Sequence, residues 1–281
     1  MRGDPAALEL VPAASVAEVC ARVEEGYRPF AGGTDVMVLL SSGRLAHARW
    51  VDLAGVPELR RIDVGDEEIT LGALTTYTDV RRHAVVSAEL PMLAQAARET
   101  GGVAIQNRGT LGGNVANASP AADSPPALLA YDADLVLASR AGTRRVPYAS
   151  FHTGYKRTLL APGEIVASIV VSRRPGRVGA YRKVGPRRAQ AISKVCFAGC
   201  VERDGDRPVR VRIALGGVAP VPVRALEAER ALLEGEPLAR AQQALSEAIA
   251  PIDDVRSTAR YRRRVAENLL ADFAHHVGLA R

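Results

Sequence analysis

Apolar and polar positions along the 281-residue chain change their spacing several times, and each spacing predicts a different element. A helix is expected over residues 15–25, because Ser15 and Glu18 have the spacing of a capping box and Gly26 follows. The elements that follow are a strand over 27–30, a short buried helix over 36–40 and a strand over 50–53. This order predicts a βαβ-like subdomain over residues 1–53.

The next segment, residues 54–175, has strand alternation on both sides of a helical region. Residues 59–64 and 68–73 alternate like a hairpin around Gly65. Further strands are expected over 133–139, 144–148 and 166–171, and helices over 76–83, 89–99 and 124–130. We interpret this segment as a second subdomain of the same domain.

From residue 178 to 281 the pattern changes to strands followed by helices, after an Arg- and Pro-rich linker. The expected strands are 178–184, 192–201 and 209–215, and the expected helices are 224–234, 238–249 and 257–276. Strands that precede helices predict an α+β domain, here a three-stranded antiparallel sheet with helices on one face. The whole chain is therefore expected to be α+β (mixed α/β).

Composition and charge exclude several classes of protein. The charged and hydrophobic fractions, 24% and 47%, are ordinary for a globular protein. The net charge of +6 is spread along the chain without a basic run that alternates with aromatics, which argues against nucleic acid binding. Such a surface is either solvated or contacts an acidic partner. No apolar run reaches membrane-spanning length and no signal pattern opens the chain, so a cytoplasmic protein is expected.

The three cysteines, Cys20, Cys196 and Cys200, are too few for a disulfide framework. Cys196 and Cys200 belong to an apolar strand, where residues four apart share a face but lie roughly 13 Å from each other. One metal ion cannot bridge that distance, so we interpret both as small core residues. The chain therefore cannot ligate a four-cysteine iron–sulfur cluster by itself.

Candidate chemistry is concentrated in residues 105–123, where small and polar residues are too dense for a core strand or an ordinary amphipathic helix. Gly109, Gly112 and Gly113 let the backbone approach a ligand. We interpret the stretch as a cradle of backbone N–H groups for a phosphate or pyrophosphate. Because a Gly-Gly pair often marks only a turn, a purely structural loop is the alternative.

A second loop has the same character. Residues 27–30 lead into Ala31-Gly32-Gly33-Thr34-Asp35, and a helix begins at once. Two such loops, about eighty residues apart, could hold one dinucleotide from two sides. Neither loop has the spacing of the Rossmann fingerprint or of the P-loop, so both of those interpretations fail.

Taken together, A-G-G-T-D at 31–35, T-L-G-G-N at 110–114 and A-S-P-A-A-D at 118–123 resemble the FAD-binding medium subunit of the molybdenum hydroxylases. This is the xanthine dehydrogenase and carbon monoxide dehydrogenase type. The segment G-Y-K-R-T-L-L at 154–160 and S-T-A-R-Y-R at 257–262 resemble the same family. The resemblance implies a two-part PCMH-type FAD-binding domain, related to vanillyl-alcohol oxidase, and then a C-terminal domain.

The resemblance also implies a set of cofactor contacts and no catalytic residue or metal ligand in this chain. The amides around Gly32, Gly33, Gly112 and Gly113 would hold the pyrophosphate of a non-covalent FAD. Other side chains would fix the pyrophosphate and the hydroxyl-bearing parts. The full set of expected contacts is Ala31, Gly32, Gly33, Thr34, Asp35, Val36, Thr110, Leu111, Gly112, Gly113, Asn114, Asp123, Tyr155, Leu160, Val166 and Lys183.

Five of these contacts have an alternative that the sequence leaves open. Asp123 either touches the cofactor hydroxyls or only caps the helix that begins at Ser124. Tyr155, Leu160 and Val166 either lie along the flavin ring or pack as ordinary loop residues. Lys183 also has two interpretations. It either lies near the flavin, where its charge would stabilise an anionic reduced ring, or it is a solvated strand lysine.

The resemblance implies an electron-transfer subunit. Electrons would arrive from a molybdopterin-binding large subunit through a [2Fe–2S] small subunit and leave from FAD to NAD+ or another acceptor. The cofactors of both partners would be bound outside this chain. Two other functions remain open: a free-standing FAD-dependent oxidase or dehydrogenase, for which no general base can be identified, and a binding or scaffold module with a degenerate flavin site. The intact Gly-Gly loops argue against the scaffold.

Overall fold

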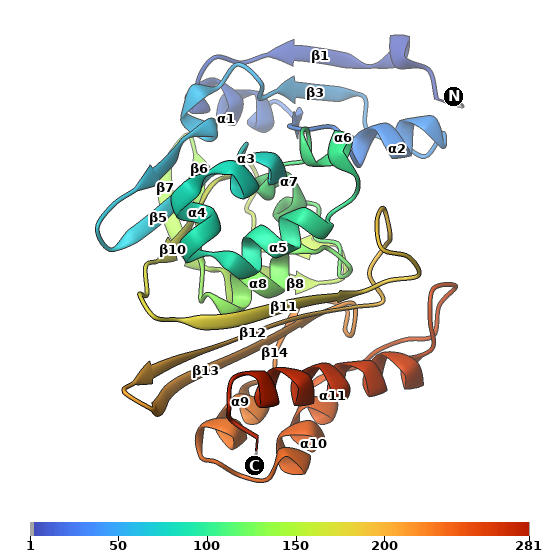
Figure 1. Ribbon diagram of the computed structural model, residues 1–281. Helices are drawn as coiled ribbons and strands as arrows, with labels where there is room; N and C mark the ends of the chain where they lie inside the picture. Colours follow the sequence, from blue (N-terminus) through green and yellow to red (C-terminus); the bar gives the residue numbers. More distant parts are fainter. Residues whose placement is uncertain (1–2, 281) are drawn as a thin grey trace.

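Three sheets follow one another along the chain, and Figure 1 shows them from the N-terminal sheet down to the C-terminal helices. The computed structural model describes residues 3–280. The first sheet is parallel, with the strand order β1-β3-β2. Its elements are β1 (Glu9–Pro12), α1 (Val16–Glu24), β2 (Arg28–Phe30), α2 (Val36–Ser41) and β3 (Arg49–Asp52).

The predicted helix α1 and strands β2 and β3 are present, whereas the sequence analysis expects no strand at β1. Ser15 accepts a hydrogen bond from the Glu18 amide at 3.2 Å and caps α1, as the sequence predicts. The expectation that residues 36–40 form a buried helix is wrong, because only Leu40 of α2 is buried. The helix exists, but most of its apolar side chains point outward.

The second sheet has five strands in the order β4-β5-β10-β6-β7, and the predicted hairpin around Gly65 is present as β4 and β5. The strands are β4 (Ile62–Val64), β5 (Glu68–Gly72), β6 (Asp134–Ser139), β7 (Gly142–Pro147) and β10 (Ile165–Ser172). A two-stranded sheet of β8 (His152–Gly154) and β9 (Arg157–Thr158) lies before β10. Short 3₁₀ helices occur at Pro5–Ala7, Pro57–Arg60 and Tyr148–Ser150.

The helices of this region are shorter and more numerous than the sequence predicts. They are α3 (Tyr77–Arg82), α4 (Ala84–Glu89), α5 (Pro91–Glu99), α6 (Val103–Gln106), α7 (Leu111–Ala116) and α8 (Ser124–Ala130). Helix α3 corresponds to the helix expected over residues 76–83, and a capping box of Thr76 and Asp79 opens it. The sequence gives no helix at α4, whose N-cap is the His83 ring nitrogen rather than a Ser, Thr or Asp side chain.

The C-terminal sheet is antiparallel, with the strand order β11-β12-β13-β14. Its elements are β11 (Val178–Val184), β12 (Val195–Asp204), β13 (Arg207–Gly216), β14 (Val223–Arg224), α9 (Leu226–Leu233), α10 (Leu238–Ala248) and α11 (Ala259–His276). The expected three strands are therefore four. Because β14 has only two residues, it shows no alternation that a sequence could reveal.

This sheet is buried on both faces, which explains the uninterrupted apolar run of β12. Val195, Phe197 and Val201 pack with α9–α11. Cys196 and Cys200 belong to the opposite face and to the larger core of the preceding region. The two cysteines share a face and are buried, as predicted. The C-terminal sheet thus lies between its own helices and the region that contains α5 and α8 (Figure 1).

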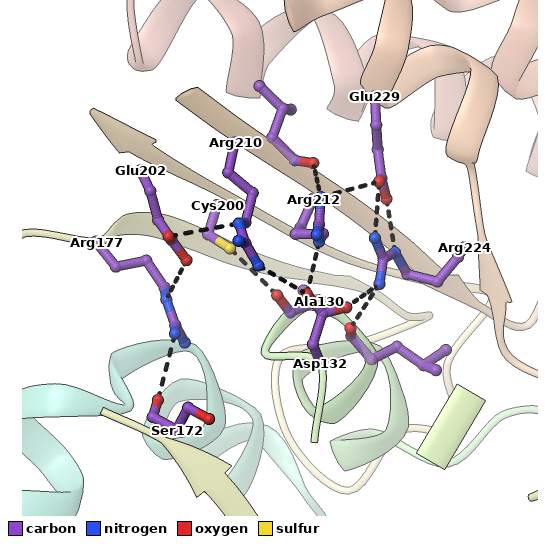
Figure 2. Close-up of polar contacts among 12 residues, drawn as sticks. Ala130, Asp132, Ser172, Arg177, Cys200, Glu202, Arg210, Arg212, Arg224 and Glu229 are labelled. Atoms are coloured by element: carbon purple, nitrogen blue, oxygen red, sulfur yellow. Dashed lines mark hydrogen bonds and ion pairs between the residues drawn. The ribbon is translucent and has the colours of Figure 1, made fainter. Parts of the chain in front are cut away.

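A polar network fixes this arrangement on the α8 side of the sheet (Figure 2). Asp132, in the turn after α8, accepts hydrogen bonds from Arg212 at 2.7 Å and Arg224 at 2.5 Å. Arg224 also forms a two-pronged pair with the buried Glu229 of α9, at 2.6 and 2.7 Å. Nearby, Glu202 lies 3.4 Å from Arg177.

In residues 3–280, no helix is both long and apolar enough to cross a membrane.

Candidate cofactor site

The first predicted phosphate loop, residues 31–36, lies at the carboxyl end of strand β2 and leads directly into α2. Ligands of open parallel sheets bind at this end of the strands. Gly33 has φ of +73°, a conformation that L side chains rarely adopt, and it lets the chain turn from strand to helix. Ala31 and Val36, at either end of the loop, are half-buried, and Ala31 packs against the core.

Backbone N–H groups of the first loop are available to a ligand. Within residues 3–280, the amides of residues 32–36 donate no hydrogen bond to a protein acceptor. The side chain of Asp35 makes no capping bond to α2 either. Because unpaired amides at a helix start attract anions, this loop fits a phosphate or diphosphate.

The second loop, residues 105–123, begins at the end of one short helix, α6, and contains another, α7, where the sequence analysis expects no helix. Thr110 is the N-cap of α7 and accepts from the Gly113 amide at 3.1 Å. Helix formation here depends on tertiary contacts, because two glycines in six residues disfavour it.

The amides of this second loop are already used within the protein. Leu111 donates to the Thr75 carbonyl and Gly112 to the Ala73 carbonyl, both at 2.9 Å. The Gly113 amide bonds to the Thr110 hydroxyl. The amides around Gly112 and Gly113 were expected to face a pyrophosphate, but the structure pairs them with protein acceptors. A diphosphate can meet free N–H groups on the first loop, whereas any contact with Gly112 or Gly113 must use other backbone atoms. Their assignment as cofactor contacts stays a prediction.

Glycines allow the two loops to approach each other. A Cβ added to Gly32 would lie 1.9 Å from the Arg108 carbonyl oxygen, far inside contact distance. A Cβ added to Gly113 would point toward the Ala31 methyl group, 4.0 Å away. The two loops therefore lie in close contact at Gly32, and a dinucleotide held between them stays a prediction. The oxygen of the Asn114 amide accepts from the Ser124 hydroxyl, which anchors α7 to α8.

The β8–β9 hairpin contributes a cation to the same region. The ammonium group of Lys156 donates to the Asn117 carbonyl at 2.9 Å and to the Asn117 side-chain oxygen at 3.1 Å. Burial lowers the pKa of Lys156, and the negative charge of Asp35 acts in the opposite direction. Burial also raises the pKa of Tyr77, with further increases from Asp123 and Asp35. Residues from both loops and the hairpin thus lie within electrostatic reach of one another.

The three residues expected along the flavin ring differ in their exposure. Tyr155 is exposed, at 66% of its surface, and is free to cover a ligand. Leu160 is half-buried and packs against the core. Val166 is buried on β10, opposite Leu137 of β6. Of these three side chains, that of Tyr155 is the most exposed and can reach a ligand. The assignment of all three residues as flavin contacts stays a prediction.

Asp123 and Lys183 form a buried ion pair between the second loop and β11. The ammonium nitrogen of Lys183 lies 2.7 Å from the Asp123 carboxylate and also donates to the Glu99 carbonyl at 2.9 Å. Asp123 makes no side-chain cap to α8, so the capping interpretation is wrong. The interpretation of Lys183 as a solvated lysine is also wrong, because 6% of its side chain is exposed.

Further donors complete this pair. The Ser193 hydroxyl donates to Asp123 at 2.6 Å, and the Cys196 thiol lies 3.3 Å from the same carboxylate oxygen. The Tyr181 hydroxyl donates to the Asp123 backbone carbonyl at 3.0 Å. The sequence analysis does not identify these partners, nor Lys156, because each lies far along the chain from the group it contacts. Their only local signal is a polar residue inside or beside an apolar strand.

Family models of known proteins match both the N-terminal and the C-terminal parts of the chain. Residues 6–173 match the family model described as the FAD binding domain in molybdopterin dehydrogenase, and residues 180–277 match the CO dehydrogenase flavoprotein C-terminal domain. The glyceraldehyde dehydrogenase medium chain of Sulfolobus acidocaldarius is 31% identical over 86% of this chain and 87% of its own length. The carbon monoxide dehydrogenase medium chain of Hydrogenophaga pseudoflava is 31% identical over 85% of each.

Solved structures agree with these matches. A chain in the carbon monoxide dehydrogenase structure from Hydrogenophaga pseudoflava that lacks the Mo-pyranopterin moiety superposes with a TM-score of 0.91, at 29% identity and 98% coverage of both chains. A chain of quinoline 2-oxidoreductase from Pseudomonas putida 86 gives 0.90, at 26% identity, with 99% of this chain and 98% of that chain covered.

Proposed function

Because this chain belongs to the family of FAD-binding subunits of molybdenum hydroxylases, we propose that it is the electron-transfer subunit of such a complex. Electrons arrive from [2Fe–2S] clusters on a small partner subunit, which receives them from a molybdopterin-binding large subunit. They leave through non-covalent FAD on this chain to NAD+ or another acceptor.

The observation that carries the proposal is the run of unpaired amides at residues 32–36, on a loop that lines an open cleft together with Ala104, Ile105 and Arg108. These amides hold the diphosphate, and the hydroxyl and carboxylate of Thr34 and Asp35 lie beside it. Thr110 and Asn114 keep α7 in place through its N-cap and its bond to Ser124. The bound FAD supplies the redox chemistry, since it exchanges both single electrons and hydride.

The protein's own residues orient the cofactor and exclude water. Tyr155 is positioned on an exposed hairpin from which its ring can cover a ligand. Lys183 and Asp123 anchor the C-terminal sheet to the second loop, which fixes the far wall of the site. No residue of this chain is assigned a proton-transfer step.

The test is an anaerobic reduction of the purified chain. We expect visible absorption bands near 450 nm, characteristic of flavins, that bleach when NADH is added. Bands that resist NADH but bleach with a chemical reductant would retain the FAD assignment and exclude NAD+ as the acceptor. A colourless protein that FAD cannot reconstitute would refute the proposal.

A further inference from the structure

His152 is a half-buried titratable residue on the β8–β9 hairpin, outside the set of expected cofactor contacts. It is the first residue of β8 and pairs with Thr158 of β9. Its ring meets the Tyr148 ring edge-on, with 5.4 Å between the centroids, and its centroid lies 5.3 Å from that of Phe151. Both of these aromatic residues are buried. Such surroundings favour a neutral imidazole, because burial penalises the charged form.

The ring nitrogens of His152 have two partners, and the neutral form satisfies both. Nε2 lies 3.4 Å from the Tyr148 hydroxyl. The backbone carbonyl of Val115, in α7, accepts a hydrogen bond from the ring. A neutral ring with its proton on Nδ1 donates to Val115 and accepts from Tyr148. A doubly protonated ring directs a second N–H at the Tyr148 hydroxyl, which must then turn its own proton away from its partner.

Helix α7 is bonded to this hairpin at its C-terminal end. Val115 lies in the last turn of α7, and Asn117 is the C-cap. The Lys156 ammonium group donates to the Asn117 carbonyl at 2.9 Å and to its side-chain oxygen at 3.1 Å. His152 and Lys156 thus place two donors of the hairpin at the carbonyl end of a short helix that contains two glycines. The other end of α7 begins at Thr110, within the second cofactor loop.

Few charged groups face the His152 ring. Helix α7 and the 3₁₀ helix that follows β7 contain no charged residue. The charged residues of the hairpin are Lys156 and Arg157, and Asp35 of the first loop acts on Lys156. Burial raises the pKa of Tyr148, so the phenol keeps its proton. Burial is also the larger influence on the pKa of His152 and lowers it. His152 is therefore the group of this cluster that changes charge below neutral pH.

We propose that neutral His152 positions α7 for the cofactor and that its protonation releases the hairpin, which makes FAD retention dependent on pH. This inference rests on the proposed function, because it concerns the regulation of the same FAD site. His152 acts through α7 and the hairpin, not by contact with the cofactor. Because its pKa in the folded chain is lowered, the neutral form is complete above about pH 6.5 and is lost as pH falls further. One proton then raises the Kd for FAD by up to about tenfold per pH unit.

The test measures the Kd for FAD by flavin fluorescence with the full-length apo chain, between about pH 5 and pH 7.5. His152→Asn keeps an amide N–H at the position of Nδ1 but cannot take up a proton. His152→Leu has a similar volume and no donor. The matched control is His83→Asn. His83 also caps a short helix, α4, through a ring nitrogen 3.3 Å from the Val86 amide, and it lies outside both cofactor loops.

We expect wild type and His83→Asn to lose affinity toward acid pH with the slope of one proton. His152→Asn should bind FAD within about threefold of wild type at about pH 7.5 and should lack the slope. His152→Leu should bind about tenfold more weakly and also without the slope, because the Val115 carbonyl has lost its donor. In an NMR titration, FAD should lower the pKa of His152, since linkage is reciprocal.

Four results would overturn the inference. They are a pH-independent Kd in wild type, a slope that persists in His152→Asn, unchanged affinity in His152→Leu, and a slope that disappears in His83→Asn. If His152→Leu does not fold, His152→Asn and the NMR titration still decide. Failure of the proposed function is distinct, because the wild-type chain would then bind no FAD at any pH.

Discussion

Replacing Gly32 by Ala tests whether the two loops must approach closely. The added methyl carbon would lie 1.9 Å from the Arg108 carbonyl oxygen and 2.6 Å from its carbon, whereas ordinary contact begins at 3.4 Å. The loops must therefore separate by about 1.5 Å, and both contact atoms belong to the backbone. Because φ at position 32 is not positive, alanine can adopt the local conformation, and the cost comes from this contact alone.

Overpacking of this kind costs about 1–3 kcal/mol. In the free protein, the loops can relieve part of that cost by moving apart. If the cofactor must contact both loops, binding requires them to close again, and the full cost then appears in the binding free energy. The Kd for FAD should rise about 5- to 150-fold.

The assay is a titration of apo protein with FAD, followed by flavin fluorescence, together with the thermal midpoint of the apo form. The control is Gly65→Ala in the β4–β5 turn, where the added carbon meets only the Glu68 carbonyl at 3.4 Å. A Gly32→Ala protein that binds FAD within about twofold of wild type would contradict the two-sided clamp. A fall in thermal midpoint with unchanged affinity would assign Gly32 to stability alone.

Three further outcomes are expected. Glu229→Gln should lower the free energy of unfolding by about 1.5–3 kcal/mol, measured by urea denaturation, because it removes one of the two carboxylates that pair with Arg224 and leaves only Asp132. Burial lowers the pKa of His152, so its neutral form is favoured in the folded state and stability should fall as pH drops below about 6.5; thermal midpoints of His152→Gln should lack this component. Burial raises the pKa of Cys200 to about 12, so a thiol reagent should modify it only after unfolding, and modification of the native protein would contradict its burial.

The elements that the sequence predicts well are those with a local cause. The cap at Ser15, the helix that begins near Thr76 and the hairpin around residue 65 depend on neighbours a few positions away. The exposure of α2 has no such cause. Its apolar run predicts burial, and only the position of the rest of the chain decides that one side chain, Leu40, is covered.

The predicted cofactor loops show the same limit. Glycine spacing identifies where the backbone can approach a ligand, because that property belongs to the residue itself. It does not reveal which amides remain free. The amides of Leu111 and Gly112 bond to the carbonyls of Thr75 and Ala73, about forty residues earlier in the chain, and only tertiary structure brings these groups together. Two loops with similar sequences thus have different hydrogen-bonding capacity.

Lys183 illustrates how tertiary structure changes the chemistry expected of a residue. A lone lysine near a reduced flavin would contribute a positive charge. Here its ammonium group is held by the Asp123 carboxylate at 2.7 Å and the Glu99 carbonyl at 2.9 Å, and Ser193 donates to the same carboxylate. The Lys183–Asp123 pair therefore presents little net charge to its surroundings. Its effect on the cofactor site depends on whether the ion pair is intact more than on how far it lies from the ligand. Any stabilisation of a reduced ring by Lys183 would require the cofactor to compete with Asp123 for the ammonium group. The same pair joins β11 to the second loop, so the geometry of the cofactor site depends on the C-terminal domain being docked.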